Sequence, residues 1–239
     1  MGSSELPPYT VRESARARGV RLTVSARDGL VVVVPARYPA QRIPAIVAGR
    51  RRWIERALLR VNERRAAMLG GREQLPSRIE MPGIAESWAA EYAPTASATV
   101  RARAVRGVVR LSGAVADGDA CRAALRRFCR ARAAEALPSM LKILSAEEGL
   151  AFTAVCVRSQ RTRWGSCSGR GSISLNHQLA FLPPRLVRHV MLHELVHTMR
   201  LDHSARFHAL LAERETDAAH LARELRQAWR HVPGWALDE

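Results

Sequence analysis

The segment from Pro183 to Met199 constrains the fold most, because its pattern fits only one kind of element. Two prolines open it, and proline is favoured in the first turn of a helix. His193, Glu194 and His197 then form an HExxH pattern flanked by apolar residues. Positions i and i+4 share one helix face, so both imidazoles can reach one cation. The segment therefore predicts a half-buried helix that carries a pair of metal ligands.

The expected ion is zinc, because imidazole suits zinc and a hydrolytic site needs an open coordination position. Glu194 projects from a neighbouring position and could accept a proton from a bound water without being a ligand itself. His203 follows His197 by six residues, which is the spacing of the third metzincin ligand. Arg200, however, stands where that pattern has a turn glycine.

Other third ligands fit the sequence as well. A carboxylate could come from the following helix, from Glu213, Glu215 or Asp217. His189 lies one turn before His193, and His208 lies one and a half turns beyond His203. The plainest alternative is a histidine-rich helix that binds no metal.

The net charge of the chain indicates possible partners, and its cysteines indicate the cellular compartment. The formal net charge is +16, which suggests an anionic partner such as nucleic acid. Lys142 is the only lysine among the 38 basic residues, so the arginine excess equally fits a compositional bias. Four widely spaced cysteines form no CxxC pair, and no long apolar run or signal segment occurs. These features favour a reduced cytoplasmic protein without a membrane partner.

The N-terminal part predicts a small β-rich unit with one long helix. Strands are expected at 9–12 and 20–25, followed by a hairpin at Asp28-Gly29 and a return strand at 30–34. Residues 41–69 read as one helix whose apolar stripe includes Trp53 and Ile54. Its arginines, including those at 50–52, predict a solvated face or, as a minority interpretation, a nucleic-acid contact.

The rest of the chain alternates strands and helices. We expect a loop or boundary at 70–83, a hairpin at 97–112 that turns at Arg106-Gly107, and a helix to Gly149 with a break or kink near Pro138. Asp117 or Asp119 would cap that helix. Further strands are expected at 151–158 and 172–176, and one long amphipathic helix at 202–232. The predicted division is 1–80 and 81–239, which together form one continuous compact unit.

Three stretches carry a resemblance to a known family. They are RTRWGSCSGRGSISLNHQLAFLP at 161–183, HELVH at 193–197 and DHSARF at 202–207. Together they resemble the YgjP-like zinc metallopeptidases and, more distantly, SprT-like and WLM-type peptidases. The strong part of the resemblance covers about residues 155–215. Asp202 stands where the family often has asparagine.

The resemblance implies an α+β fold with a zincin-like metallopeptidase domain, in which the HExxH helix lies beside a small sheet. It implies one zinc ion per chain on His193, His197 and His203. It also implies hydrolysis of peptide bonds in a peptide or protein substrate by a zinc-bound water, with Glu194 as the base.

Several residues around the motif are candidates for other roles in the site. Candidates for contacting the substrate or its oxyanion are Arg161, Arg163, Asn176, His177 and Arg200. Asp202, Glu213 and Asp217 could hydrogen-bond to the metal-binding histidines and so orient them. The strand at 172–176 could be an edge strand that pairs with an extended substrate. We expect Trp164 to pack beneath this strand and Cys167 to be a structural thiol rather than an inhibitory ligand.

Two other classes of function fit the same sequence. The first is a nucleic-acid-associated protein with DNA-triggered proteolysis or a structural zinc site, in which a basic surface makes non-specific contacts. The second is a zinc hydrolase that acts on a non-peptide amide.

Overall fold

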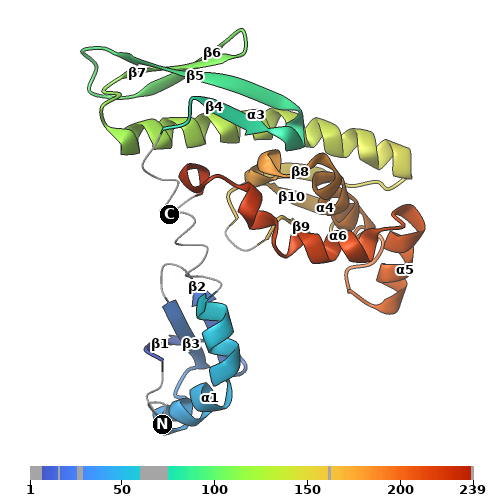
Figure 1. The fold of residues 1–239 in the computed structure, drawn as a ribbon. Helices are drawn as coiled ribbons and strands as arrows, with labels where there is room; N and C mark the ends of the chain where they lie inside the picture. Colours follow the sequence, from blue (N-terminus) through green and yellow to red (C-terminus); the bar gives the residue numbers. More distant parts are fainter. Residues whose placement is uncertain (1–6, 16, 26–28, 60–74, 161–162, 238–239) are drawn as a thin grey trace. The chain divides into compact units, whose positions relative to one another are not determined.

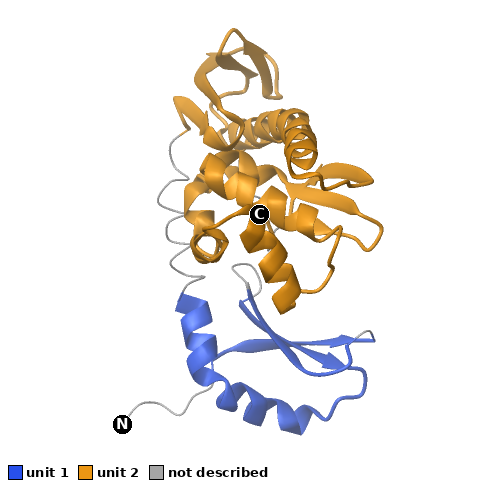
Figure 2. Ribbon diagram, turned by 90° about the vertical axis from the view of Figure 1, so that its right-hand side faces the viewer, with its two compact units in different colours: residues 1–70, 239 blue, residues 71–238 orange. Residues whose placement is uncertain are grey.

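The computed structural model describes residues 7–15, 17–25, 29–59, 75–160 and 163–237. They fall into two compact units, residues 1–70 and residues 71–238 (Figure 2). The expected division at residues 80 and 81 into two folding parts stays a prediction. Among the described helices, none combines the length and the apolar character needed to cross a membrane.

Unit 1, residues 1–70, is built on a three-stranded sheet in the order β1-β3-β2 (Figure 1). The strands are β1 (Tyr9–Ser14), β2 (Arg21–Ser25) and β3 (Gly29–Pro35). β2 and β3 pair antiparallel with Ser25 opposite Gly29, which confirms the predicted hairpin, although Asp28 lies outside the described residues. The central place of β3 explains its unbroken apolar sequence, since both faces of the strand are buried.

The helical part of unit 1 differs from the single predicted helix. A 3-10 turn, η1 (Ala40–Arg42), leads into α1 (Ile43–Gly49), and a turn at Arg50 separates α1 from helical residues 51–59. Glycine disfavours a helix interior by about 1 kcal/mol relative to alanine, which is consistent with a break at Gly49. Ile43, Val47 and Ile54 pack on β3, but Trp53 is 39% exposed. Placing Trp53 on the buried stripe was therefore wrong.

Unit 2, residues 71–238, begins with a four-stranded sheet in the order β4-β5-β7-β6. Its strands are β4 (Arg78–Met81), β5 (Glu86–Pro94), β6 (Arg101–Val105) and β7 (Val108–Gly113). The expected hairpin is confirmed, and its turn uses the positive φ angles of Arg106 and Gly107. The expected loop at 70–83 is wrong in its second half, where β4 and the 3-10 turn η2 (Pro82–Ile84) form.

A long helix, α3 (Gly118–Glu148), runs along the four-stranded sheet and continues past β8 and α4 (Figure 1). The Asp117 carboxylate accepts hydrogen bonds from the backbone N–H groups of Asp119 and Ala120, so Asp117 is the N-cap. Gly149, at φ 64°, ends the helix as predicted. The helix continues through Pro138, and the predicted break there is not found.

A second sheet of three strands lies beside the motif-bearing helix. β8 (Ala154–Arg158) pairs parallel with β10 (Ser172–Asn176), and β9 (Gly165–Cys167) pairs antiparallel with β10. The order is β8-β10-β9, so β10 is the inner strand. This corrects the hypothesis that residues 172–176 form a substrate-pairing edge. The edge strand that packs against α4 is β9.

The C-terminal helices complete unit 2. A 3-10 segment, η3 (His177–Phe181), precedes α4 (Pro184–Val196), followed by α5 (Ala205–Arg214) and α6 (Ala218–Leu225). Two 3-10 turns, η4 (Ala228–His231) and η5 (Gly234–Ala236), close the chain. The single helix expected at 202–232 is therefore wrong, because Glu215 adopts an extended conformation. Helices and sheets of both pairing types make the fold α+β, as predicted.

Candidate metal centre

Three imidazoles converge at the C-terminal end of α4. The Nε2 atom of His193 lies 3.1 Å from Nε2 of His197 and 3.2 Å from Nε2 of His203. Two nitrogens held by one tetrahedral zinc ion lie about 3.3 Å apart, so these separations suit a single cation. Among the described histidines, cysteines and carboxylates, this is the one group of three whose ligand atoms all lie within 4.8 Å of one another.

The turn that delivers His203 does not use glycine. After α4, Met199 N–H and Arg200 N–H both donate to the Val196 carbonyl. The non-glycine residues with positive φ in the described chain are Arg37, Ala85 and Arg106, so Arg200 needs no left-handed conformation. The Asp202 carboxylate then accepts a hydrogen bond from Ser204 N–H at 3.3 Å, which closes a tight turn around His203.

The backbone at Arg200 also fixes the tautomer of His197. The Arg200 carbonyl lies 2.8 Å from Nδ1 of His197. A carbonyl oxygen can only accept, so Nδ1 carries the proton and Nε2 presents a lone pair to the centre. A backbone partner of this kind orients a metal-binding histidine and sets its basicity.

The environment favours the neutral form of two of these imidazoles, those of His193 and His197. Burial, together with the neighbouring histidines, lowers the pKa of His193 to about 3. Burial likewise lowers the pKa of His197. Neutral imidazole is the form that binds metal, so neither side chain has to lose a proton near pH 7.

Phe207 of α5 forms a platform for the three histidines. Its buried ring stacks on His197 with centroids 4.5 Å apart. It meets His193 and His203 edge-on at 4.9 and 5.0 Å. The aromatic that closes the DHSARF stretch therefore limits the rotation of every imidazole in the group, a role that its sequence position alone did not reveal.

Glu194 is buried beside this group without a full set of partners. Its side chain is 6% exposed, and its Oε2 atom has no hydrogen-bond partner. Burial raises the pKa of Glu194 to about 7, and the nearby positive charge of Arg163 opposes this shift. A buried unsatisfied carboxylate oxygen marks a place where a water or ligand group is expected.

Gly165 of β9 supplies the space that Glu194 occupies. A Cβ atom at this position would lie 2.7 Å from both Cγ and Oε1 of Glu194. Only a residue without a side chain allows the edge strand to approach the carboxylate this closely. The sequence analysis did not single out Gly165, although the glycine of RWGSC was the available signal.

The residues predicted to contact the substrate differ in exposure, since some lie at the surface and others are buried. Arg163 is exposed and acts on Glu194 through its charge, and Arg200 is exposed on the turn. Asn176 is fully buried; its amide donates to the Gln160 and Arg163 carbonyls and accepts from Gln178 N–H. Asn176 thus holds the loop before β9. His177 is also buried, within 3.4 Å of Ser159 Oγ. Arg161 lies outside the described residues.

The acidic residues expected behind the ligands take other places. Asp202 shapes the turn around His203, and its pKa is lowered chiefly by its hydrogen bond with Ser204. The exposed Glu213 pairs with Arg214 at 3.8 Å, and Asp217 is exposed at the start of α6. No described hydrogen bond or ion pair joins Glu213 or Asp217 to the three histidines.

Two of the rival ligands, His189 and Glu215, bond to each other. His189 bonds through Nδ1 to the Glu215 carboxylate, which also accepts from Arg188 at 3.4 Å. Cys167 is outside the three-histidine group, and burial raises the pKa of its thiol. Trp164 is buried, as expected, and stacks on Trp229 with centroids 4.1 Å apart.

The α+β fold and the clustered histidines are compatible with a metallopeptidase, and comparison with known families shows that class. The family model described as "YgjP-like, metallopeptidase domain" matches residues 18–228. The chain therefore belongs to the YgjP-like family, as its motifs indicated. Comparisons with curated proteins and with solved structures gave no match.

Proposed function

We propose that this chain is a zinc-dependent peptidase of the HExxH type with a zincin-like active site. His193, His197 and His203 would hold one zinc ion through their Nε2 atoms, and Glu194 would act as the catalytic base. The observation that carries the proposal is the convergence of three imidazoles beside a buried carboxylate with an unsatisfied oxygen. A surface cluster of histidines without a metal would require neither feature.

The zinc ion and the protein residues would have different roles in the reaction. Bound zinc would polarise the scissile carbonyl and lower the pKa of a water to near 7. Glu194 takes a proton from the attacking water on its carboxylate and returns it to the leaving amine. Its pKa of about 7 allows the carboxylate to do both near neutral pH. Because Gly165 has no side chain, the Glu194 carboxylate has room to occupy this position.

The substrate would bind along β9 rather than β10. β9 pairs with β10 on one side only, and its outer side is the free edge of the three-stranded sheet. An extended peptide can add to such an edge through backbone hydrogen bonds, which tolerate many side chains. This placement brings the peptide next to Gly165 and therefore next to Glu194.

Arg163 is the best-placed described candidate for stabilising the oxyanion. It is exposed on the segment that leads into β9, and its charge already acts on Glu194. A guanidinium near the developing negative charge lowers the barrier to reaction. The buried Asn176 and His177 would instead support the loop that carries Arg163.

Metal content tests the first half of this proposal. Purified full-length protein loaded with zinc and then desalted should retain about one ion per chain, as a three-histidine site would. His197→Ala should retain much less, whereas His208→Ala should match the wild type. A wild-type content far below one ion, or equal retention by His197→Ala, contradicts the proposed ligand set. The cytoplasmic location expected from the sequence remains a prediction.

A further inference from the structure

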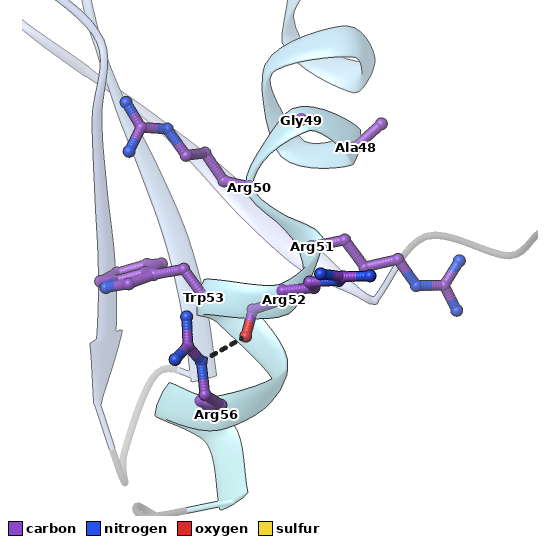
Figure 3. A pocket seen from close by; sticks show the side chains of 7 residues that line it. All are labelled: Ala48, Gly49, Arg50, Arg51, Arg52, Trp53 and Arg56. Atoms are coloured by element: carbon purple, nitrogen blue, oxygen red, sulfur yellow. Dashed lines mark hydrogen bonds between the residues drawn. The ribbon is translucent and has the colours of Figure 1, made fainter.

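Unit 1 carries a basic, aromatic surface that the peptidase chemistry does not use. An open pocket is lined by residues 48–53 together with Arg56 (Figure 3). It lies where the helix breaks at Arg50 and helical residues 51–59 begin. We call Arg50, Trp53 and Arg56 the Arg-Trp face.

Helical spacing explains how this face forms. Ile54 and Ala57 are buried, which fixes the side of the helix that packs on the sheet of unit 1. Trp53 and Arg56 are three residues apart, so they are neighbours on the outer surface. Figure 3 shows Arg50, Trp53 and Arg56 extending to one side of the helix, while Arg51 and Arg52 extend to the other.

The charges of the face are uncompensated. Arg51 donates to Glu55 at 2.8 Å, so that pair neutralises itself. Among the described residues, no carboxylate forms an ion pair with Arg50 or Arg56. Arg56 Nε donates to the Arg52 carbonyl at 3.1 Å, which steadies one guanidinium while its terminal nitrogens stay free for a ligand.

Trp53 is the second, independent feature. It is 39% exposed and belongs to neither hydrophobic core. A single exposed apolar residue is ordinary on a protein surface. An exposed indole beside the guanidinium groups of Arg50 and Arg56, neither of which forms an ion pair among the described residues, is a more specific combination, because it offers a stacking surface and anion-binding groups together.

We propose that the Arg-Trp face binds single-stranded nucleic acid. The guanidinium groups contact phosphates, and the Trp53 indole stacks on one base. An unstacked base is available in a single strand, whereas duplex bases are stacked on one another. An acidic peptide would satisfy the arginines but leave the indole without a matching group. The net charge of +16 attracts any polyanion and therefore adds to the on-rate rather than to the choice of ligand.

The test is fluorescence anisotropy of a labelled oligo(dT) with the full-length protein at several salt concentrations. Arg50→Gln/Arg56→Gln should weaken binding at least about 10-fold and make the log–log salt slope shallower by about 1.4, as expected for two lost phosphate contacts on a single strand. Trp53→Ala should weaken binding by about 5- to 150-fold with an unchanged slope. Trp53→Phe should restore most of the affinity.

The matched control removes the same charge elsewhere. Arg101→Gln/Arg103→Gln changes two exposed arginines of β6 and should leave the slope nearly unchanged. Equal losses in the two double variants would show a diffuse charge effect and overturn the proposal. So would absent binding at low salt, an unaffected Trp53→Ala variant, or equally effective competition by polyglutamate. Binding should persist after removal of metal, which separates this test from that of the peptidase site.

Discussion

Gly165 and Glu194 are in direct contact across the gap between β9 and α4, and no side chain fits between them. A Cβ atom on Gly165 would come within 2.7 Å of Oε1 of Glu194. This contact therefore constrains the positions of both the edge strand β9 and the proposed base Glu194. Any change that enlarges residue 165 must move either the strand or the carboxylate.

Gly165→Ala should therefore impair cleavage without removing the metal. A displacement of about 1 Å in a catalytic group can lower the rate about 100-fold. Casein cleavage and zinc content, measured on the same preparation, test this. Gly169→Ala is the matched control, because its Cβ would meet Leu201 at an ordinary 3.5 Å. Equal activity of the two variants would show that the Gly165 contact does not position Glu194.

Phe207 should matter to both stability and metal affinity. Phe207→Ala removes a fully buried ring and should lower the free energy of unfolding by about 3 to 5 kcal/mol. It should also weaken zinc binding, because the imidazoles lose the surface that orients them. Leu211→Ala, also buried on α5, should lower stability but retain zinc affinity. Denaturant unfolding and zinc titration separate the two effects, and unchanged zinc affinity in Phe207→Ala would refute the platform role.

Arg200→Gly tests the account of the turn. The described backbone at Arg200 has no positive φ, so glycine relieves no strain there. The substitution should leave zinc affinity unchanged and cost about 0.4 to 1 kcal/mol through the entropy of the unfolded chain. A clear gain in zinc affinity would indicate that arginine strains the turn.

Glu86 gives stability a pH dependence remote from the metal centre. Its carboxylate accepts two hydrogen bonds from Arg132, at 2.6 and 3.0 Å to Nη2 and Nε, and one from Trp88 Nε1 at 2.7 Å. The hydrogen bonds from Arg132 hold the pKa of Glu86 below its usual value of 4.5. The folded state therefore gains stability above pH 4.5 and loses this contribution as the pH falls through the lowered pKa.

Glu86→Gln should accordingly reduce the free energy of unfolding at pH 7 by about 1 to 3 kcal/mol. The difference from wild type should shrink as the pH drops below 4.5. Glu80→Gln, in the exposed pair with Arg78, should change stability little. Urea unfolding at a series of pH values measures both variants, and a difference that grows toward low pH would contradict the assignment.

Local patterns predicted the elements that depend on local sequence. The HExxH helix, the hairpin at Arg106-Gly107 and the caps of α3 follow from helical spacing, turn chemistry and an aspartate N-cap. The helix breaks at Arg50 and Glu215 did not follow. At Glu215 the continuing amphipathic pattern suggested a helix, but its carboxylate bonds to His189 and Arg188, which lie far away in sequence.

For the candidate site, too, the sequence predicted the features that depend on residue spacing and missed those that depend on long-range structure. The spacing of His193, His197 and His203 indicated a common centre, and the structure brings their Nε2 atoms together. Strand order depends on long-range pairing, so the sequence did not show that β10 is internal and β9 is the edge. The roles of the Arg200 carbonyl and of the space at Gly165 depend on backbone position, which residue type does not encode.

The most direct test of the central claim is the pair of measurements on Glu194→Gln. Glutamine keeps the size of the side chain but cannot take a proton from water. The variant should retain about one zinc ion per chain, because the three histidines are unchanged. Its casein cleavage should fall below detection under conditions in which the wild type is active. Retained zinc with undiminished cleavage would contradict the assignment of Glu194 as the base.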